Sequence, residues 1–226
     1  MPHRQQLRVD RDLAALRERT LRMAALCEAI LAKSLQALWD RDAGLASEVK
    51  RDDLDIDRLD VDIDDAVLRI LALTAPVAAD LRMVVAIKSI ATNLERVGDL
   101  ARNIATSAVR IASHESFVIP DELHVLADQS RRVLSHANHA FAELDAELAR
   151  RVLEEDDPID ALEDRLVRES IARLTAVPET TEPELDLIFV ARDLERVADQ
   201  ATNIAEEVVL AAEAKILKHA SKLGTA

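Results

Sequence analysis

Acidic side chains recur at helical spacing in four segments of the chain, and carboxylates in that arrangement could hold a hard cation. Glu95 and Asp99 stand four residues apart, and Glu195 and Asp199 repeat that spacing 100 residues later. At about 100° per residue, such positions stack on one face of a helix, where their oxygens can bridge neighbouring ions. The acidic members of the four stripes are Asp53, Asp57, Asp60, Asp64, Glu95, Asp99, Asp156, Asp160, Glu163, Glu195 and Asp199.

Carboxylate oxygens suit Mg²⁺, Ca²⁺, Mn²⁺ or iron, whereas zinc is less favoured because no Cys or His stands in the stripes. A solvated helix face with surface ion pairs is the plain alternative for any one stripe. Two observations weigh against it. Between Asp52 and Asp65 there are eight aspartates in 14 residues, with Arg58 as the only basic residue, although like charges four apart repel. The stripes also recur in both halves of the chain.

Six helices are expected to position these stripes, because prolines and polar clusters divide the chain into long segments. The expected ranges are about 7–40, 42–74, 76–113, 121–144, 145–177, and from a turn at 178–183 to about 219. The most loop-like stretch, from His114 to Pro120, predicts two domains, residues 1–115 and 116–226.

An internal repeat supports this division. Residues 91–109 and 191–209 share 11 of 19 positions at an offset of 100, including Glu, Arg, Asp and Asn, which a shared apolar pattern would not match by itself. In both segments the apolar residues alternate steps of three and four, which is typical of a helix packed in an antiparallel bundle. The sequence therefore predicts an all-α protein of two tandem antiparallel three-helix bundles. Relative to the apolar seam, the carboxylate stripes are expected to face solvent.

Composition limits the partners. The net charge of −14 argues against nucleic acid, and basic clusters that would bind an anionic lipid surface are missing. No apolar stretch approaches the roughly 20 residues of a membrane helix, so no membrane insertion is expected. Cys27 is the only cysteine, which fits a reducing compartment. We therefore expect a cytoplasmic protein.

Catalysis has no positive support, because the chain contains no Gly-rich phosphate loop, no nucleophile elbow and no Cys–His arrangement. A ferritin-like di-iron or metal-storage bundle is the sharpest rival, but it needs Glu-x-x-His pairs, and none occurs. A purely structural bundle used for dimer contacts is the third reading. Long bundle faces often pair, so a homodimer is expected, although its interface is not readable from the residues.

At its best-defined segments the sequence resembles the PhoU family. The longest match is PVAADLRMVVAIKSIATNLERVGDLARNIA, residues 76–105, and residues 56–73 resemble the helix that precedes it. The block ARDLERVADQATNIAEEV repeats the pattern in the second half. The resemblance implies two three-helix bundles and a cytoplasmic role in repressing the phosphate regulon when phosphate is plentiful. It implies contacts with the ATPase subunit of the phosphate ABC transporter and with a sensor histidine kinase.

The resemblance also implies surface metal sites, because some members of the family bind multinuclear metal clusters through Glu/Asp-x-x-x-Asp motifs. Carried over to this chain, the motifs are Asp53-x-x-x-Asp57, Glu95-x-x-x-Asp99, Asp156-x-x-x-Asp160 and Glu195-x-x-x-Asp199, with Asp60, Glu163, Asn103 and Asn203 one or two turns along. Pro158 departs from this pattern, because a proline starts or kinks a helix. Two roles are thus open for Asp156, a helix cap or a ligand.

Overall fold

Helices make up nearly the whole of the structure, a computed structural model that describes residues 2–217. The elements, in chain order, are α1 (Pro2–Asp40), α2 (Ala43–Thr74), α3 (Ala78–Ala112), α4 (Asp121–Glu143), α5 (Ala146–Glu154), α6 (Asp156–Ala176), the 3₁₀ turn η1 (Pro178–Thr180) and α7 (Thr181–Glu213). No strand occurs within this range. The predicted all-α class is therefore confirmed.

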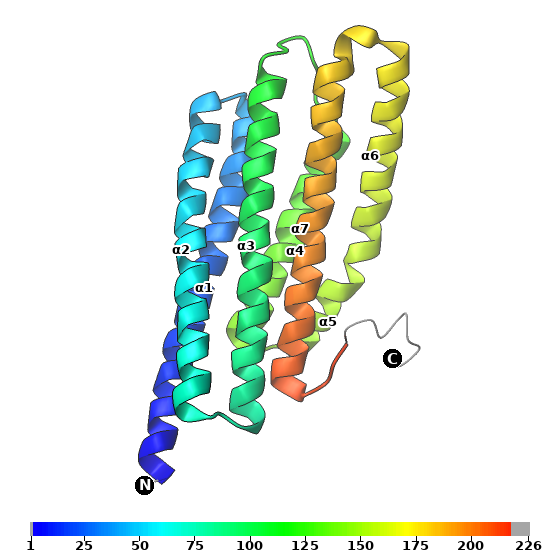
Figure 1. Cartoon of the computed structure of the whole chain (residues 1–226). Helices are drawn as coiled ribbons and strands as arrows, with labels where there is room; N and C mark the ends of the chain where they lie inside the picture. Colours follow the sequence, from blue (N-terminus) through cyan, green and yellow to red (C-terminus); the bar gives the residue numbers. More distant parts are fainter. Residues whose placement is uncertain (1, 218–226) are drawn as a thin grey trace.

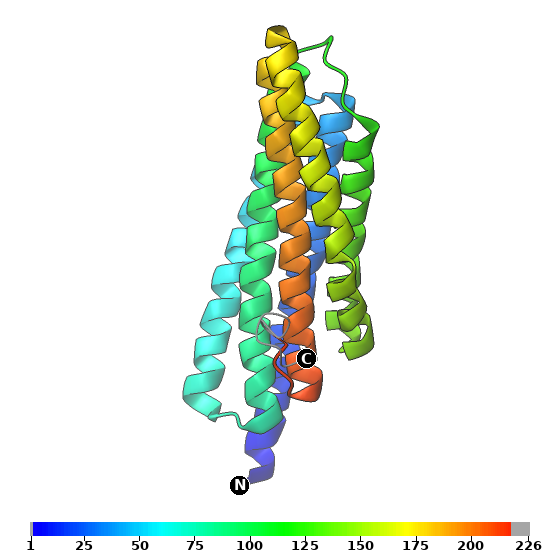
Figure 2. The ribbon, with the colours of Figure 1, turned by 90° about the vertical axis from the view of Figure 1, so that its right-hand side faces the viewer.

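The helices form two antiparallel three-helix bundles that lie side by side. The first bundle is α1, α2 and α3, and the second is α4, the α5–α6 pair and α7 (Figure 1). Helices α3 and α7 meet along the middle of one face, with α2 and α6 at its outer edges and with α1 and α4 behind (Figures 1 and 2). The α2–α3 turn and the α6–α7 turn point to opposite ends of the molecule (Figure 1). Each carboxylate stripe therefore lies on a helix of this one face.

The fifth predicted helix is interrupted. The sequence reading expected one helix over 145–177, whereas α5 ends at Glu154 and α6 begins at Asp156. Pro158 explains the position of the break, because its ring collides with the carbonyl of residue i−4, here Glu154, and it cannot donate to it. The two pieces together occupy the place of one long helix (Figure 1), so the six-helix layout is preserved.

The duplication extends to the turns. Arg41 and Leu144 both adopt a left-handed conformation, with φ of 54° and 52°. The next residue caps the following helix in both repeats. The Oδ1 atom of Asp42 accepts hydrogen bonds from two backbone N–H groups at 2.8 and 3.0 Å, and that of Asp145 does so at 2.9 Å twice. Asparagine, aspartate and serine are the preferred residues at this position because they satisfy orphan helix donors.

Helix ends differ from expectation at both termini of the chain. Helix α1 begins at Pro2 rather than near Leu7, and proline suits a first helical position. Helix α7 ends at Glu213, because Ala214 takes a left-handed conformation with φ of 60°. The sequence reading extended this helix to about residue 219, whose last two positions lie outside the described residues.

One hydrophobic core runs through both bundles. Leu94, Val97 and their repeat partners Leu194 and Val197 are fully buried in it. Residues 113–120 connect α3 to α4 outside any helix, and the division into domains at 115 and 116 remains a prediction. Among the described helices, none is long and apolar enough to cross a membrane.

Candidate functional site

The acidic stripes of α2 and α3 face each other where the two helices approach closely. We call their residues, Asp53, Asp57, Asp60, Asp64, Glu95 and Asp99, the first carboxylate row. Asp53 on α2 is 1% exposed, so it is buried, contrary to the expectation that the stripes face solvent. A Cβ atom placed on Gly98 of α3 would lie 2.9 Å from Asp53 Oδ1 and 3.2 Å from a methyl group of Ile56. The missing side chain at Gly98 thus makes room for the Asp53 carboxylate against α3.

Two basic side chains of α3 already engage this row. Arg102 Nη1 lies 2.9 Å from Asp53 Oδ2, and the same guanidinium pairs with Asp99. Lys88 pairs with Asp64 and reaches to 3.9 Å from Asp60. From the sequence, a surface ion pair between Arg102 and Asp99 of the same helix is one interpretation of the stripe. The contacts of Arg102 with Asp53 and of Lys88 with Asp64 join two different helices, and the sequence did not predict them. Neither Arg102 nor Lys88 recurs at the 100-residue offset, so the internal repeat did not single them out.

Glu95 stands where the two stripes of the first repeat meet. Burial raises its pKa, and the charges of Asp99, Asp60, Asp57 and Asp53 raise it further. The structure therefore brings the predicted residues of α2 and α3 into one electrostatic cluster. Burial likewise raises the pKa of Asp53 and of Asp60, against the opposing charges of their basic partners.

The second carboxylate row consists of Asp156, Asp160 and Glu163 of α6 and Glu195 and Asp199 of α7. Basic side chains neutralise its charge less than that of the first row. Burial raises the pKa of Glu195 to about 7, and the charges of Asp199, Asp160, Glu163 and Asp156 add to the effect. At the positions of Lys88 and Arg102 the second repeat carries Ile188 and Thr202, so those two cations have no counterpart. The main opposing charges come from other arginines.

Those arginines lie at the margin of the second row. Arg192 Nε is 3.8 Å from Glu163 Oε1, and the charge of Arg196 lowers the pKa of Asp199, which burial raises. An open hollow of about 510 Å³ lies beside this row, and no basic residue lines it. Its lining residues are Asp157, Asp160, Ala161, Glu163, Asp164 and Glu195.

Asp156 is not a helix cap. It is the first residue within α6, and Glu155 occupies the cap position without making a side-chain cap hydrogen bond. The Oδ1 atom of Asp156 is buried and has no hydrogen-bond partner among the described residues. Burial raises the pKa of Asp156 to about 6, followed by the charges of Asp160, Asp199 and Asp157. A buried carboxylate oxygen without a hydrogen-bond donor suits a cation ligand, and the Oδ1 atoms of Asp60 and Asp64 in the first row share this feature, with Lys88 nearby.

The rows do not form a finished coordination shell. Within residues 2–217, no group of three or more His, Cys, Asp or Glu side chains is arranged so that it could hold a metal ion as it stands. The predicted ligands differ in access. Asp53 is buried, Asp57 and Asp160 are exposed, and the remaining candidates, Asp60, Glu95, Asp99, Asp156, Glu163, Glu195 and Asp199, are half-buried. The structure thus brings the stripes together as neighbours, and metal binding stays a prediction.

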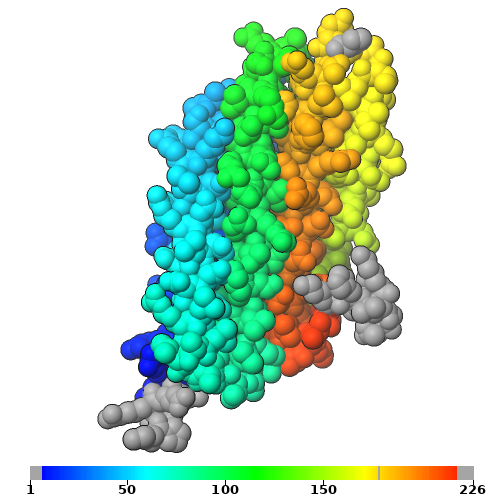
Figure 3. Space-filling view, in the orientation of Figure 1, coloured from blue at the N-terminus to red at the C-terminus, as the bar shows by residue number. Residues whose placement is uncertain are grey.

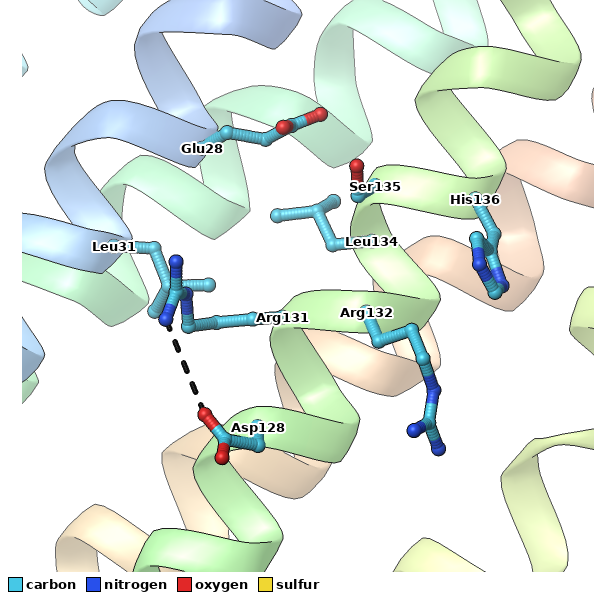
Figure 4. A pocket seen from close by; sticks show the side chains of 8 residues that line it. All are labelled: Glu28, Leu31, Asp128, Arg131, Arg132, Leu134, Ser135 and His136. Atoms are coloured by element: carbon cyan, nitrogen blue, oxygen red, sulfur yellow. Dashed lines mark ion pairs between the residues drawn. The ribbon is translucent and has the colours of Figure 1, made fainter.

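A further hollow, of about 370 Å³, lies between α1 and α4 on the other face (Figure 4). Glu28 and Arg131 reach toward it from the two helices, whereas Arg132 and His136 point away (Figure 4). His136 Nδ1 lies 3.0 Å from Glu155 Oε1, and Glu28 Oε1 accepts a 2.7 Å hydrogen bond from the side chain of Asn138. These polar groups already have partners within the fold.

Asp193 is a buried acid that the sequence reading did not single out. It lies on α7, is 8% exposed, and its nearest cation, Arg196 Nη1, is 3.8 Å away. Burial raises its pKa to about 6, against the charge of Arg196. The repeat itself held a signal, because the equivalent residue on α3 is the neutral Asn93.

Asp193→Asn is expected to stabilise the protein in alkaline solution. A carboxyl whose folded pKa exceeds its unfolded value loses stability as pH rises through the interval between the two, here from about 4 to 6. The amide removes that penalty, so the free energy of unfolding should rise by about 2 kcal/mol at pH 8 and change little near pH 4. Urea unfolding at both pH values measures the difference. Asp128→Asn, on an exposed carboxylate, is the control, and an equal gain at both pH values would contradict the assignment.

Comparison with known proteins gives a consistent match over both repeats. A family model described as the PhoU domain matches residues 20–108 and 123–208. The phosphate-specific transport system accessory protein PhoU homolog of Aquifex aeolicus is 34% identical over 213 residues, which are 94% of this chain and 96% of that protein.

Solved structures agree with that match. The crystal structure of PhoU from Pseudomonas aeruginosa superposes with a TM-score of 0.88 at 32% identity, covering 91% of this chain and 99% of the other. The phosphate transport system regulatory protein PhoU from Streptococcus pneumoniae gives a TM-score of 0.86 at 27% identity, covering 92% and 98%.

Proposed function

The chain belongs to the PhoU family, and on this premise we propose that it is a cytoplasmic, non-enzymatic regulator of phosphate uptake. The proposal is carried by the likeness over most of the chain, including both repeats, to proteins named as accessory or regulatory parts of the phosphate transport system. A fold can host unrelated functions, but relatives that cover both repeats at this identity support a shared role.

Regulation would proceed through protein contacts. The proposed partners are the ATPase subunit of the phosphate ABC transporter and a sensor histidine kinase. Helices α2, α3, α7 and α6 form one broad face of the molecule (Figure 3), and the carboxylate rows lie on these helices, which suits recognition of a protein surface. Association as a homodimer is a further prediction, which sedimentation velocity would measure directly.

Deletion of the gene in its own host tests the regulatory role. We expect a phosphate-starvation reporter to switch on in high-phosphate medium, and the wild-type gene supplied in trans should restore repression. A reporter that stays repressed after deletion, with normal phosphate uptake, would reject the proposal. Measurement of phosphate uptake alongside the reporter separates loss of signalling from loss of transport.

We also propose that the carboxylate rows bind divalent or iron cations, the second row first. The proposed ligands provide only oxygen donors, which favours Mg²⁺, Mn²⁺ or iron over zinc. The support lies in the raised pKa values of Glu195 and Asp156, the unpartnered Asp156 oxygen and the hollow beside them that no basic side chain lines. Bound cations would neutralise repulsion within the row. They would hold the α6–α7 pair together through side chains of both helices.

Calorimetric titration of the chelator-treated protein with Mn²⁺ tests this proposal. Asp160→Asn/Glu195→Gln should weaken binding at least tenfold, because it removes a charged ligand from each helix. Asp57→Asn/Glu95→Gln, the same pair in the first repeat, should have a smaller effect because Arg102 and Lys88 already neutralise that row. Absence of stoichiometric Mn²⁺, Mg²⁺ or Fe²⁺ binding by wild type would reject the site. Oxidase turnover after iron loading would favour the di-iron alternative instead.

A further inference from the structure

A hollow of about 350 Å³ lies between α3 and α7, the two helices through which the repeats meet (Figure 1). All of its lining residues are polar, and they include Ser89, Asn93 and Arg96 of α3 and Asn203 and Glu207 of α7. Its size is that of a small-molecule site, and its polar lining disfavours an apolar helix or a lipid chain as the occupant.

Two hydrogen bonds fix how α3 and α7 lie against each other around the hollow. Ser89 Oγ donates to Glu207 Oε1 at 2.8 Å, and Arg110 Nε donates to Asp186 Oδ1 at 2.6 Å. The two contacts are 21 residues apart on each helix, so one antiparallel register holds between them. In this register Arg96 and Glu207 are roughly 10 Å apart along the helix axis, at 1.5 Å per residue. The two charged side chains therefore lie toward opposite ends of the hollow.

Arg96 provides a cation that has no internal partner. Its side chain is exposed and makes no ion pair or hydrogen bond with any described residue. The equivalent arginine of the second repeat, Arg196, lies 3.8 Å from Asp193, but α3 carries the neutral Asn93 at the position of that aspartate. Asn93 donates instead to the backbone oxygen of Ser89 at 2.8 Å. The Arg96 guanidinium is therefore available to a ligand carboxylate, which it fits with two parallel N–H donors.

Glu207, at the other end of the hollow, has an oxygen that lacks a donor. Its Oε1 atom accepts the hydrogen bond from Ser89, whereas its Oε2 atom is buried and has no hydrogen-bond partner among the described residues. Asn203, one turn away on α7, likewise makes no hydrogen bond within the part of the chain that the structure describes. A buried carboxylate oxygen is satisfied by a cationic N–H donor, and an ammonium group supplies three such donors.

The other half of the same helix pair shows that packing does not require these groups. At the 100-residue offset, Phe189 stands where α3 has Ser89, and Ser107 stands where α7 has Glu207. The equivalent place therefore lacks both partners of the hydrogen bond that crosses the hollow. Since α3 and α7 pack together there without them, the carboxylate beside the free arginine is a feature of this hollow alone.

We propose that the hollow between α3 and α7 binds a small zwitterion with a carboxylate and an ammonium group at opposite ends of a short chain, as in a basic amino acid such as lysine. The carboxylate pairs with the Arg96 guanidinium, and the terminal ammonium donates to Glu207 Oε2. A single inorganic ion cannot make both contacts across roughly 10 Å. The lining carries two carboxylates and one guanidinium, so a ligand with a net positive charge balances it, whereas a phosphate ion would be repelled.

Calorimetric titration of the full chain with L-lysine tests this inference, which goes beyond the proposed regulatory role. We expect saturable binding in the millimolar range or tighter. Arg96→Gln and Glu207→Gln should each weaken it roughly tenfold or more, because each removes one charged contact. Arg196→Gln is the matched control from the second repeat and should change binding less than about twofold. The thermal midpoints of Arg96→Gln and Glu207→Gln should stay close to wild type, because Arg96 has no partner to lose and glutamine still accepts from Ser89.

Two analogues separate the two contacts. L-norleucine lacks the terminal ammonium of lysine, and 1,5-diaminopentane lacks the carboxylate, so both should bind more weakly than L-lysine, by about tenfold or more. Glu207→Gln should not weaken L-norleucine binding further, and Arg96→Gln should not weaken 1,5-diaminopentane binding further. These pairings assign each end of the ligand to one side chain.

Absence of saturable L-lysine binding up to tens of millimolar ligand would overturn the proposal. Equal binding of either analogue would also overturn it, because attraction of any cation to an acidic surface would then be sufficient. Unchanged binding by both Arg96→Gln and Glu207→Gln would place the ligand elsewhere. The reporter assay tests the regulatory role separately, so failure of the lysine titration leaves that role untouched.

Discussion

Arg102→Met is expected to lower the free energy of unfolding by about 3 kcal/mol at pH 7, because it leaves the buried Asp53 carboxylate without its ion-pair partner. Asp53 is 1% exposed, and Arg102 Nη1 is 2.9 Å from its Oδ2 atom. Removing one partner of a buried ion pair typically costs about 3–5 kcal/mol, and the lower value applies because Arg102 is partly exposed. For a chain of this size the thermal midpoint should fall by roughly 6–12 °C.

The pH dependence of this variant distinguishes an electrostatic cause from lost packing. Burial already raises the pKa of Asp53, and loss of Arg102 raises it further. The folded state then binds a proton more readily than the unfolded state, so stability falls as pH rises through the raised pKa and recovers as pH is lowered. The deficit should therefore shrink at pH 5. Asp53→Asn/Arg102→Met should recover most of the lost stability at pH 7, and equal deficits at both pH values would contradict this account.

Arg110→Met is the second large effect, because Arg110 joins the two repeats. Its Nε atom donates a 2.6 Å hydrogen bond to Asp186 Oδ1 across the α3–α7 contact, and Asp186 is 5% exposed. The Arg110 guanidinium also donates to Ser107 Oγ at 3.1 Å. Methionine would leave Asp186 buried without its cation, and the free energy of unfolding should fall by about 2–3 kcal/mol.

Guanidinium unfolding at pH 7 measures this change. Arg168→Met is the matched control, because the Arg168–Asp164 pair is exposed on both sides, at 73% and 66%, and surface pairs contribute under about 1 kcal/mol. Equal effects of the two substitutions would show that burial of Asp186 does not govern the strength of the pair. Asp186→Asn/Arg110→Met should recover part of the loss.

Local periodicity accounts for what could be predicted. Steps of three and four place apolar residues on one face whatever the rest of the chain does, so the seam through Leu94 and Val97 predicted buried helix faces correctly. The same argument placed Glu95 and Asp99 on one stripe, and the 100-residue repeat predicted the second bundle. The start of the second helix near residue 42 was also predicted, and Asp42 caps that helix in the structure, because a cap acts on the backbone of its own helix.

Contacts between helices could not be predicted in the same way. Periodicity says which residues share a face, but the rotation of each helix about its axis and the register between neighbours depend on packing of the whole core. The rotation and register of α2 and α3 place Asp53 in a buried position beside Gly98. They also place Arg102 and Lys88 within ion-pair distance of the aspartates of α2. The rotation and register of α6 and α7 likewise leave Asp156 Oδ1 without a donor.

The amino-acid sequence by itself therefore determined that this is a duplicated helical chain with rows of carboxylates, since helix formation, capping and stripe geometry act within about one turn. Only the tertiary structure decided which carboxylates are neutralised, which are crowded, and which apolar residues remain uncovered at the end of the α2–α3 hairpin. The reason is that the ionisation and exposure of a side chain depend on distances to other helices. Those distances arise only when the helices pack together.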